Sequence, residues 1–311
     1  MKHHKIYIGI SSCLLGENVR YDGGHTYNAH IVETLRDYCH FNSFCPETDI
    51  GLGIPRPPIQ LHWNKNTIQC LAVDDASINL TQQLIDCADK QKLAHKQLSA
   101  YIFKRNSPSC GPIHVKIIRE GQIEFTSVGI YSQRLQENFP SMPIADEDTL
   151  AQAGALENFM QRAVAYQRWQ RLIAENINIA TLTRFHQQYD LLVKSHDERA
   201  CYKLGQILLN TDSLSTTKLA ERYVSALMDS LAVSVTRKGL FKVLDLLLKR
   251  VEIHANTADF QCAKKHLEQY RVEACTLQTL IALFKPYIDK DPEPIFSQSY
   301  FLRPHPVELL D

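Results

Sequence analysis

Three of the nine cysteines lie in turns that are rich in small residues or proline. Cys13 follows two serines, Cys45 precedes a proline, and Cys110 ends the segment that begins with Ser107 and Pro108. Each comes just after an expected strand, and ligands of open α/β sheets bind at the carboxyl ends of the strands. Backbone amides in such turns can point at sulfur or at an anion. We therefore expect the three thiols to converge on one site.

Three converging thiolates are compatible with several kinds of site. They can hold zinc with one open position, form a catalytic cysteine site, or bind three irons of a cubane cluster and leave the fourth iron free. The chain has no C-x-x-C motif, so the spacing of zinc ribbons and ferredoxins is absent. The spacing of the cysteines alone does not distinguish these three kinds of site from one another. It also does not distinguish such a site from three unrelated cysteines in loops.

The other six cysteines lie inside expected helices or strands and lack such turns. Disulfides are rare in a reducing compartment, where a buried cysteine behaves as a small hydrophobic residue. We expect these six to be packing residues: Cys39, Cys70, Cys87, Cys201, Cys262 and Cys275.

Composition limits the location and the partners of the protein. Lys and Arg total 34, as do Asp and Glu, so no net charge attracts nucleic acid or a membrane. The apolar run near the N-terminus is too short for a signal peptide, and no later run approaches the length of a membrane span. These features predict a cytosolic protein without a membrane partner, in which local basic patches would have to bind any nucleic acid.

The elements that must position the three cysteines are predicted to form an α/β domain over residues 1–150. Short apolar runs indicate strands at 5–10, 41–44 and 101–104, and helical periodicity indicates helices at 28–39, 77–98 and 131–138. Further strands are expected at 59–63, 67–73, 115–118 and 123–125, and the proline-rich and glycine-rich run 51–58 is expected to be an ordered loop. This order predicts an open, mostly parallel sheet with flanking helices.

The C-terminal half is predicted to be all α. Glycine and proline nearly vanish after residue 151, and long runs with helical period continue to about residue 288. One such run carries Leu240, Val243, Leu244, Leu247 and Val251 on one face. Residues 289–311 are rich in proline and are expected to form a tail without regular structure.

Four segments, in order and spacing, resemble the thiouracil desulfidase (TudS) family over roughly residues 5–150. They are Gly9-Ile-Ser-Ser-Cys-Leu-Leu-Gly16, Val19-Arg-Tyr-Asp-Gly-Gly24, Cys45-Pro-Glu47 with the loop 51–58, and Ser107-Pro-Ser-Cys-Gly111. Residues from about 180 to 285 resemble a YbgA-type helical domain. A fusion of the two resembles the RudS proteins, which remove sulfur from thiolated uridines in tRNA.

The resemblance implies a [4Fe-4S] cluster on Cys13, Cys45 and Cys110, whose fourth iron takes the thiocarbonyl sulfur of the substrate. It also implies that Glu47 is the base that deprotonates the attacking water, and that Ser107 bonds to the pyrimidine edge or to the developing charge. Each residue has a plainer alternative, since Glu47 could cap a turn and Ser107 could be a turn residue.

Several charged residues have two interpretations. Arg20 and Asp22 in the RYDGG segment, and Arg56 between prolines, either form a structural ion-pair set or bind the phosphate and base of the substrate. Basic residues also flank the apolar run after residue 237 and crowd the helix between the domains, where they form either solvated helix faces or contacts to tRNA. These basic residues are Lys238, Lys242 and Lys249, with Arg237 and Arg250, and then Arg162, Arg168 and Arg171.

The function predicted from the sequence is therefore [4Fe-4S]-dependent, non-redox removal of sulfur from thiolated uridine in tRNA. One alternative is a desulfidase for free thiouracil, in which the helical domain has another task. Another is a cluster-based redox sensor or RNA-binding module without turnover, which would need neither Glu47 nor an open iron. The sequence does not distinguish 2-thiouridine from 4-thiouridine.

Overall fold

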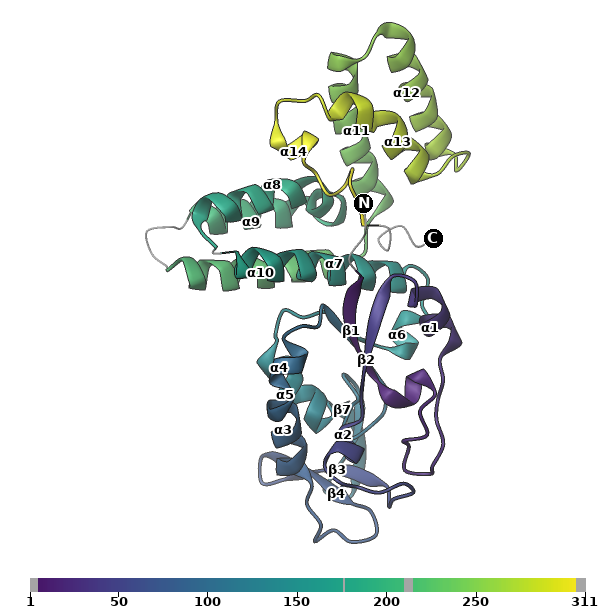
Figure 1. Ribbon diagram of the computed structural model, residues 1–311, viewed down its shortest axis with the longest axis vertical. Coiled ribbons are helices and arrows are strands. Elements are labelled where there is room, and N and C mark those ends of the chain that lie inside the picture. The colour runs from purple at the N-terminus through teal and green to yellow at the C-terminus, as the bar shows by residue number, and fades with distance from the viewer. Residues whose placement is uncertain (1–4, 176, 210–214, 306–311) are drawn as a thin grey trace. The chain divides into compact units, whose positions relative to one another are not determined.

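The computed structural model describes residues 5–175, 177–209 and 215–305 (Figure 1). The chain divides into two compact units, residues 1–167 and 168–311. The division falls within helix α7 (Ala155–Ala174), later than the change in sequence texture near residue 151. None of the helices in the described ranges is both long and apolar enough to cross a membrane.

A four-stranded parallel sheet forms the centre of the N-terminal unit. Its strands are β1 (Ile6–Ser11), β2 (Cys39–Phe44), β5 (Ala100–Phe103) and β8 (Ile144–Asp146), in the order β2-β1-β5-β8. All three neighbouring pairs are parallel. Ile6, Ile8 and Ile10 of β1 share one face of the sheet, because side chains alternate along a strand, and all three are fully buried. The expected open, mostly parallel sheet is confirmed.

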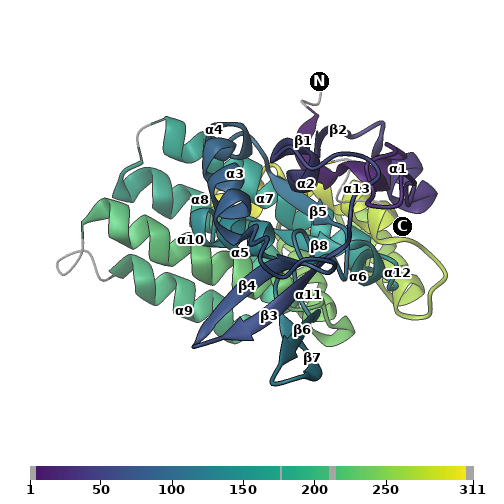
Figure 2. The same ribbon diagram turned by 90° about the horizontal axis from the view of Figure 1, so that it is seen from below.

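A second sheet of four strands lies in the same unit (Figure 2). Its strands are β3 (Ile59–Asn64), β4 (Thr67–Ala72), β6 (Val115–Arg119) and β7 (Gln122–Ser127). β3 pairs antiparallel with β4, β6 pairs antiparallel with β7, and the two hairpins join through the parallel pair of β3 and β6. Strands were expected at these positions, and the structure adds that they form a sheet of their own.

The helix expected at 131–138 is found as α5 (Ile130–Asn138), whereas the other two expected helices are shorter or divided. The helix expected at 28–39 is α1 (Ala29–Leu35), with the Asn28 side chain accepting a hydrogen bond from the Ile31 amide at its start. The helix expected at 77–98 divides into α3 (Thr81–Lys90) and α4 (Lys92–His95). The remaining helices are α2 (Pro46–Asp49), α6 (Glu147–Leu150) and the 3₁₀ helix η1 (Ser12–Leu15).

The described part of the second unit is entirely helical, as predicted. After the C-terminal end of α7 come α8 (Ile179–His196), α9 (Glu198–Leu209), α10 (Thr216–Ala232), α11 (Arg237–His254), α12 (Thr257–Arg271), α13 (Leu277–Ile288) and α14 (Pro294–Ser297). Figure 2 shows α8, α9 and α10 side by side. The buried side of α11 carries Val243, Leu244, Leu247 and Val251, four of the predicted apolar residues. α14 is a helical turn within the tail expected as coil, and residues 306–311 of that tail lie outside the described residues.

Candidate active site

The three cysteines singled out by the sequence all follow strands of the parallel sheet. Cys13 lies in η1 directly after β1, Cys45 lies between β2 and α2, and Cys110 lies in the loop after β5. Since β1 is the neighbour of both β2 and β5, the three residues leave the same edge of the sheet. Cys13 and Cys110 are buried and Cys45 is partly buried. The parallel topology thus brings the expected ligand set to one edge.

The three thiols affect one another electrostatically. Burial raises the pKa of the Cys13 thiol, and the nearby Cys45 raises it further. A hydrogen bond from the Thr26 hydroxyl and the positive charge of Lys104 act in the opposite direction and lower it. Burial also raises the pKa of Cys110, with further increases from the charge of Glu47 and from Cys45 and Cys13. In the described part of the chain, no group of three His, Cys, Asp or Glu side chains is arranged to hold a metal ion. A [4Fe-4S] cluster is several atoms wide, so its cysteine ligands surround it instead of meeting at one atom.

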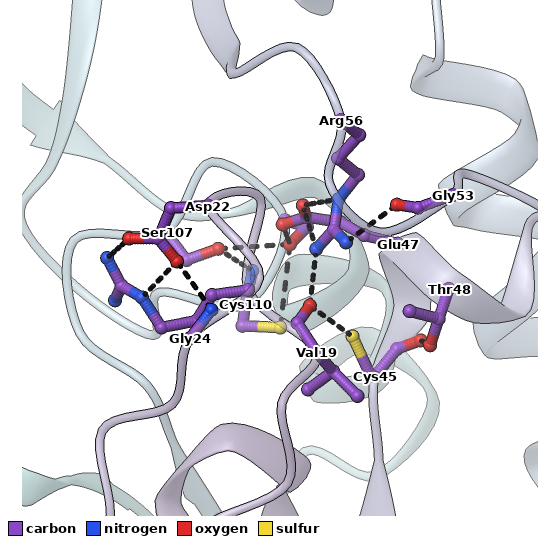
Figure 3. Close-up of polar contacts among 12 residues, drawn as sticks. Val19, Asp22, Gly24, Cys45, Glu47, Thr48, Gly53, Arg56, Ser107 and Cys110 are labelled. Carbon is purple, nitrogen blue, oxygen red and sulfur yellow. Dashed lines mark hydrogen bonds and ion pairs between the residues drawn. The ribbon is translucent and has the colours of Figure 1, made fainter.

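Glu47 lies in the first turn of α2, two residues after Cys45, and both of its carboxylate oxygens are bound (Figure 3). Oε2 accepts a hydrogen bond from Arg56 Nε at 2.9 Å and forms an ion pair with Arg56 Nη2 at 2.8 Å. Oε1 accepts a hydrogen bond from Ser109 Oγ at 2.6 Å. The side chain of Glu47 keeps 14% of its surface exposed, so the carboxylate is fixed without being sealed from water.

Arg56 comes from the loop between α2 and β3, and its side chain is only 5% exposed. Besides Glu47, its guanidinium donates to the carbonyl oxygens of Val19 at 2.8 Å and Gly53 at 3.2 Å. The Val19 oxygen also lies 3.9 Å from Cys45 Sγ. Arg56, predicted to be either a structural or a substrate-binding residue, thus directs its donors to protein atoms and joins its own loop to helix α2 and to the loop of Val19.

The loop after β5 supplies two serines with different surroundings. Ser107 is half-buried, and its Oγ accepts a hydrogen bond from the Cys110 amide at 3.2 Å. Ser109 is fully buried, and its Oγ lies 3.0 Å from Ser107 Oγ and 3.5 Å from Cys110 Sγ. Sequence analysis missed Ser109, although it belongs to the motif that identified Ser107 and Cys110. Ser109, and not Ser107, is the serine in direct contact with Glu47.

The same loop is held against the start of α5. The amides of Ile130 and Tyr131 donate to the carbonyl oxygens of Pro108 at 3.0 Å and Ser109 at 3.0 Å. The amide of Gly129 donates to the carbonyl oxygen of Gly111 at 2.8 Å. A Cβ atom at Gly129 would lie 2.6 Å from the Ser109 carbonyl carbon, closer than packed atoms allow. Glycine at position 129 is therefore required for this approach of backbone to backbone.

Arg20 and Asp22 form an ion pair at 3.3 Å, and Asp22 also accepts from the Gly24 amide at 3.0 Å. The Gly24 amide and Arg20 hold the pKa of the Asp22 carboxyl below its usual range. The charge of Arg20 also acts on Cys13, so this pair lies near the cysteine site. Lys104, which sequence analysis did not select, acts on Cys13 more strongly and forms an ion pair with Glu147.

The basic residues predicted to contact RNA lie on α11 of the second unit, and several are paired with acids there. Lys242 forms an ion pair with Glu198 at 2.6 Å, and Arg237 forms one with Glu273 at 2.7 Å. Lys238 and Lys249 are exposed and have no ion pair among the residues that the structure describes. Part of the predicted cluster is therefore engaged with acids of the same unit.

Comparison with known proteins places this site in a family. Residues 8–147 match the family model described as 2-thiouracil desulfurase. An uncharacterized protein of Bacillus subtilis strain 168, YbbK, is 32% identical over 108 residues, which cover 33% of this chain and 71% of YbbK. The chain belongs to the 2-thiouracil desulfurase family. The predicted resemblance is thus confirmed, and the N-terminal unit of this 2-thiouracil desulfurase family member is of the desulfidase class of enzymes.

The chain has two further similarities, one to a second family model and one to a solved structure. Residues 190–306 of the desulfurase family member match a second family model, DUF1722, described as a protein of unknown function. A solved structure described as a [4Fe-4S]-dependent thiouracil desulfidase, TudS, is 26% identical, covers 47% of this chain and 93% of its own, and has a TM-score of 0.39.

Proposed function

We propose that the N-terminal unit binds a [4Fe-4S] cluster through Cys13, Cys45 and Cys110 and hydrolyses the C=S bond of thiolated uridine, with tRNA as the substrate. The observation that carries the proposal is the placement of Glu47. Glu47 follows Cys45 by two residues in the sequence. Its carboxylate accepts a hydrogen bond from Ser109, which precedes Cys110 in the loop after β5. A carboxylate that could deprotonate water and three thiols that could bind iron thus lie at the same edge of the sheet.

The residues present fit such a cluster. Thiolates are the usual ligands of iron-sulfur clusters, and three of them leave one iron open to a substrate. Neighbouring thiols, two of them buried, disfavour one another's negative charge. Coordination to a cation would remove that penalty, because a coordinating thiol is deprotonated outright. When bound, the cluster supplies a soft Lewis acid that polarises the C=S bond and accepts the departing sulfur.

The protein's own residues account for the remaining steps. Glu47 accepts a proton from water, whose oxygen then forms a bond to the ring carbon as the carbon-sulfur bond breaks. Water and thiouridine give uridine and hydrogen sulfide, so no electrons are gained or lost overall. Arg56 and Ser109 keep the carboxylate in place during this transfer, because each holds one of its oxygens.

The tRNA part of the proposal is supported by the exposed cations Lys238 and Lys249 and by the resemblance of the second unit to a domain fused to tRNA desulfidases. Free thiouracil is a second candidate substrate. The family description names 2-thiouracil, and Lys242 and Arg237 are already neutralised by acids. The expected cytosolic location also remains a prediction.

One anaerobic experiment tests these proposals together. Full-length protein is analysed for iron, sulfide and the absorption of a [4Fe-4S] cluster, and then incubated with thiolated tRNA, thiouridine and 2-thiouracil. We expect one cluster per chain and the highest kcat/KM with tRNA. A higher kcat/KM with 2-thiouracil would identify the free base as the substrate. A cluster without sulfide release from any of the three would favour a redox sensor or a binding module.

A further inference from the structure

We propose that Tyr21 forms a stacking platform beside the cysteine site, on which a base next to the thiolated uridine of an RNA strand lies. This inference rests on the proposed function, because it concerns the substrate of the same site. It names that substrate more narrowly, as a thiolated uridine that has at least one neighbouring base.

The segment of residues 19–27 touches two of the three proposed cluster ligands. At one end, the Val19 carbonyl oxygen lies 3.9 Å from Cys45 Sγ, and Figure 3 shows the two residues side by side. At the other end, the Thr26 amide donates to the Cys13 carbonyl oxygen at 2.9 Å. Because the segment is short and both of its ends touch a ligand residue, the residues in its middle border the cysteine site.

Tyr21 lies in the middle of this segment and combines a fixed backbone with an exposed side chain. Its carbonyl oxygen accepts a hydrogen bond from the Arg56 amide at 2.9 Å. The surrounding turn is closed by the Arg20 amide, which donates to Gly24 at 3.1 Å, and by the Gly23 amide, which donates to Arg20 at 3.0 Å. Tyr21 is nevertheless 44% exposed. Its backbone is thus held in place before any ligand binds, while a large part of the ring remains open to contact.

Two further side chains extend this surface. Ile54 is exposed, and its Cγ2 lies 3.9 Å from the position that a Cβ atom of Gly23 would take. The Arg20 guanidinium lies 5.5 Å from the centre of the Tyr21 ring. Because Arg20 also pairs with Asp22, we assign the main contribution to the ring and not to charge. Aromatic rings on which bases stack are the usual means of binding single-stranded nucleic acid, since every base has a π face.

The location of the ring identifies which base uses it. Exposed tyrosines are common on protein surfaces, and Tyr21 is distinguished by its place at the border of the cysteine site. A thiolated ring bound at the cysteines leaves its ribose and phosphates outside, and the strand continues from there to the neighbouring bases. A free base or a nucleoside has no such neighbour. The platform therefore favours a strand over the isolated base.

The test compares substrates that differ only in the neighbouring base. Cluster-loaded full-length protein is incubated anaerobically with trinucleotides whose central residue is thiolated uridine. One set has adenine on both sides, and two sets carry an abasic residue on the 5′ or the 3′ side. Loss of the base on one of the two sides should lower kcat/KM about 5- to 100-fold, the usual contribution of stacking. Dissociation constants of the matching uridine trinucleotides, measured by equilibrium dialysis, should rise by a similar factor.

Three variants separate stacking from packing. Tyr21→Phe keeps the ring and should keep the preference for a neighbouring base. Tyr21→Leu keeps an apolar side chain but has no π face, so the preference should fall to within about threefold of unity. Tyr7→Ala is the matched control, because Tyr7 is also 44% exposed but lies near the start of β1, whereas Cys13 follows the end of that strand. Its preference should match that of wild type.

The outcomes distinguish this inference from the proposed function. Equal values for all three sets of trinucleotides with wild type, or a full preference in Tyr21→Leu, would overturn the stacking role of Tyr21. Absence of sulfide release from every thiolated compound would instead overturn the proposed function, and the dissociation constants would still test the platform. A preference kept in Tyr21→Phe and lost in Tyr21→Leu would support the inference, because a merely structural role of Tyr21 would weaken all three sets alike.

Discussion

Ser109 Oγ lies 2.6 Å from Glu47 Oε1, although 62 residues separate the two in the chain. The contact joins the loop of Cys110 to the helix that follows Cys45. Because Arg56 holds the other carboxylate oxygen, Glu47 has little rotational freedom. A carboxylate fixed in this way is already oriented before water and substrate enter, which reduces the cost of reaching the reactive arrangement.

Replacing Glu47 by Gln should separate cluster binding from turnover. Glutamine has nearly the same shape and keeps an oxygen that can accept from Ser109, but it cannot accept a proton from water. Iron and sulfide content should stay at the wild-type level, while sulfide release falls on the order of 10²- to 10⁴-fold. Turnover at the wild-type rate would show that another group activates the water.

Replacing Arg56 by Lys should lower kcat while leaving the cluster in place. Lysine keeps the charge but cannot bind Glu47, Val19 and Gly53 together. A small displacement of the carboxylate is enough to reduce kcat on the order of 10²-fold. The matched control is Arg134→Lys, which alters a two-pronged ion pair with Asp89 on the surface, at 2.8 Å and 2.9 Å. An equal loss in both variants would argue against a role for Arg56 in positioning.

Single replacement of Cys13, Cys45 or Cys110 by Ala should abolish the cluster, measured as iron and acid-labile sulfide in anaerobic protein. Replacement of Cys39, Cys70 or Cys87 should not, because these buried thiols lie in β2, β4 and α3 as packing residues. The controls should show only a modest loss of thermal stability. Full cluster content in Cys110→Ala would refute the ligand assignment.

Replacing the exposed cations Lys238 and Lys249 by Glu should weaken binding of tRNA but not of a nucleoside. Each lost phosphate contact lowers the slope of log affinity against log salt concentration by about 1. KM for tRNA should therefore rise, and its salt dependence should flatten, while KM for thiouridine stays constant as the internal control. An unchanged salt slope would mean that α11 does not contact RNA.

Replacing Asp291 by Asn should destabilise the helical unit in a pH-dependent way. Hydrogen bonds from Arg250 lower the pKa of the buried Asp291 carboxyl from 3.8 to about 2. Because the folded pKa lies below the ordinary value, the charged carboxylate stabilises the fold above about pH 4, and this contribution is lost as the pH falls toward 2. Denaturant unfolding at pH 7 should show a loss of about 1–2 kcal/mol.

That loss should shrink when the same unfolding measurement is made near pH 3. Asp245→Asn is the control, because Asp245 pairs with Arg271 at the surface and is 47% exposed. Exposed pairs contribute little, so this variant should unfold almost like wild type at either pH. A loss for Asp291→Asn that is the same at both pH values would indicate packing damage instead of lost charge.

The convergence of Cys13, Cys45 and Cys110 could be predicted because parallel strands end at the same edge of a sheet. The position of Glu47 near them follows from its distance of two residues from Cys45. The second sheet could not be predicted, since periodicity shows that a segment is a strand but not which distant strand it pairs with. The pairing of β3 with β6 joins segments that are far apart in the sequence.

The partners of charged side chains were the least predictable part of the site. The sequence leaves Arg56 compatible with substrate binding, but the loop conformation directs it to Glu47. Ser109 is more deeply buried than Ser107, and only the loop conformation brings it to Glu47. Lys242 was assigned to RNA from the pattern of one helix, whereas its partner Glu198 lies on another. In each case the deciding contact joins residues that sequence spacing does not relate.

The hydrogen bonds between the loop of Cys110 and the first turn of α5 have a consequence for motion. The first amides of a helix usually lack partners in the protein and exchange their hydrogens with water rapidly. Here the amides of Tyr131 and Ser132 both donate to the Ser109 carbonyl, at 3.0 Å and 3.2 Å. The loop can open only if these hydrogen bonds to the first turn of the helix break. Amide exchange at this end of α5 should therefore be as slow as in the middle of a helix, and should report directly on opening of the cysteine loop.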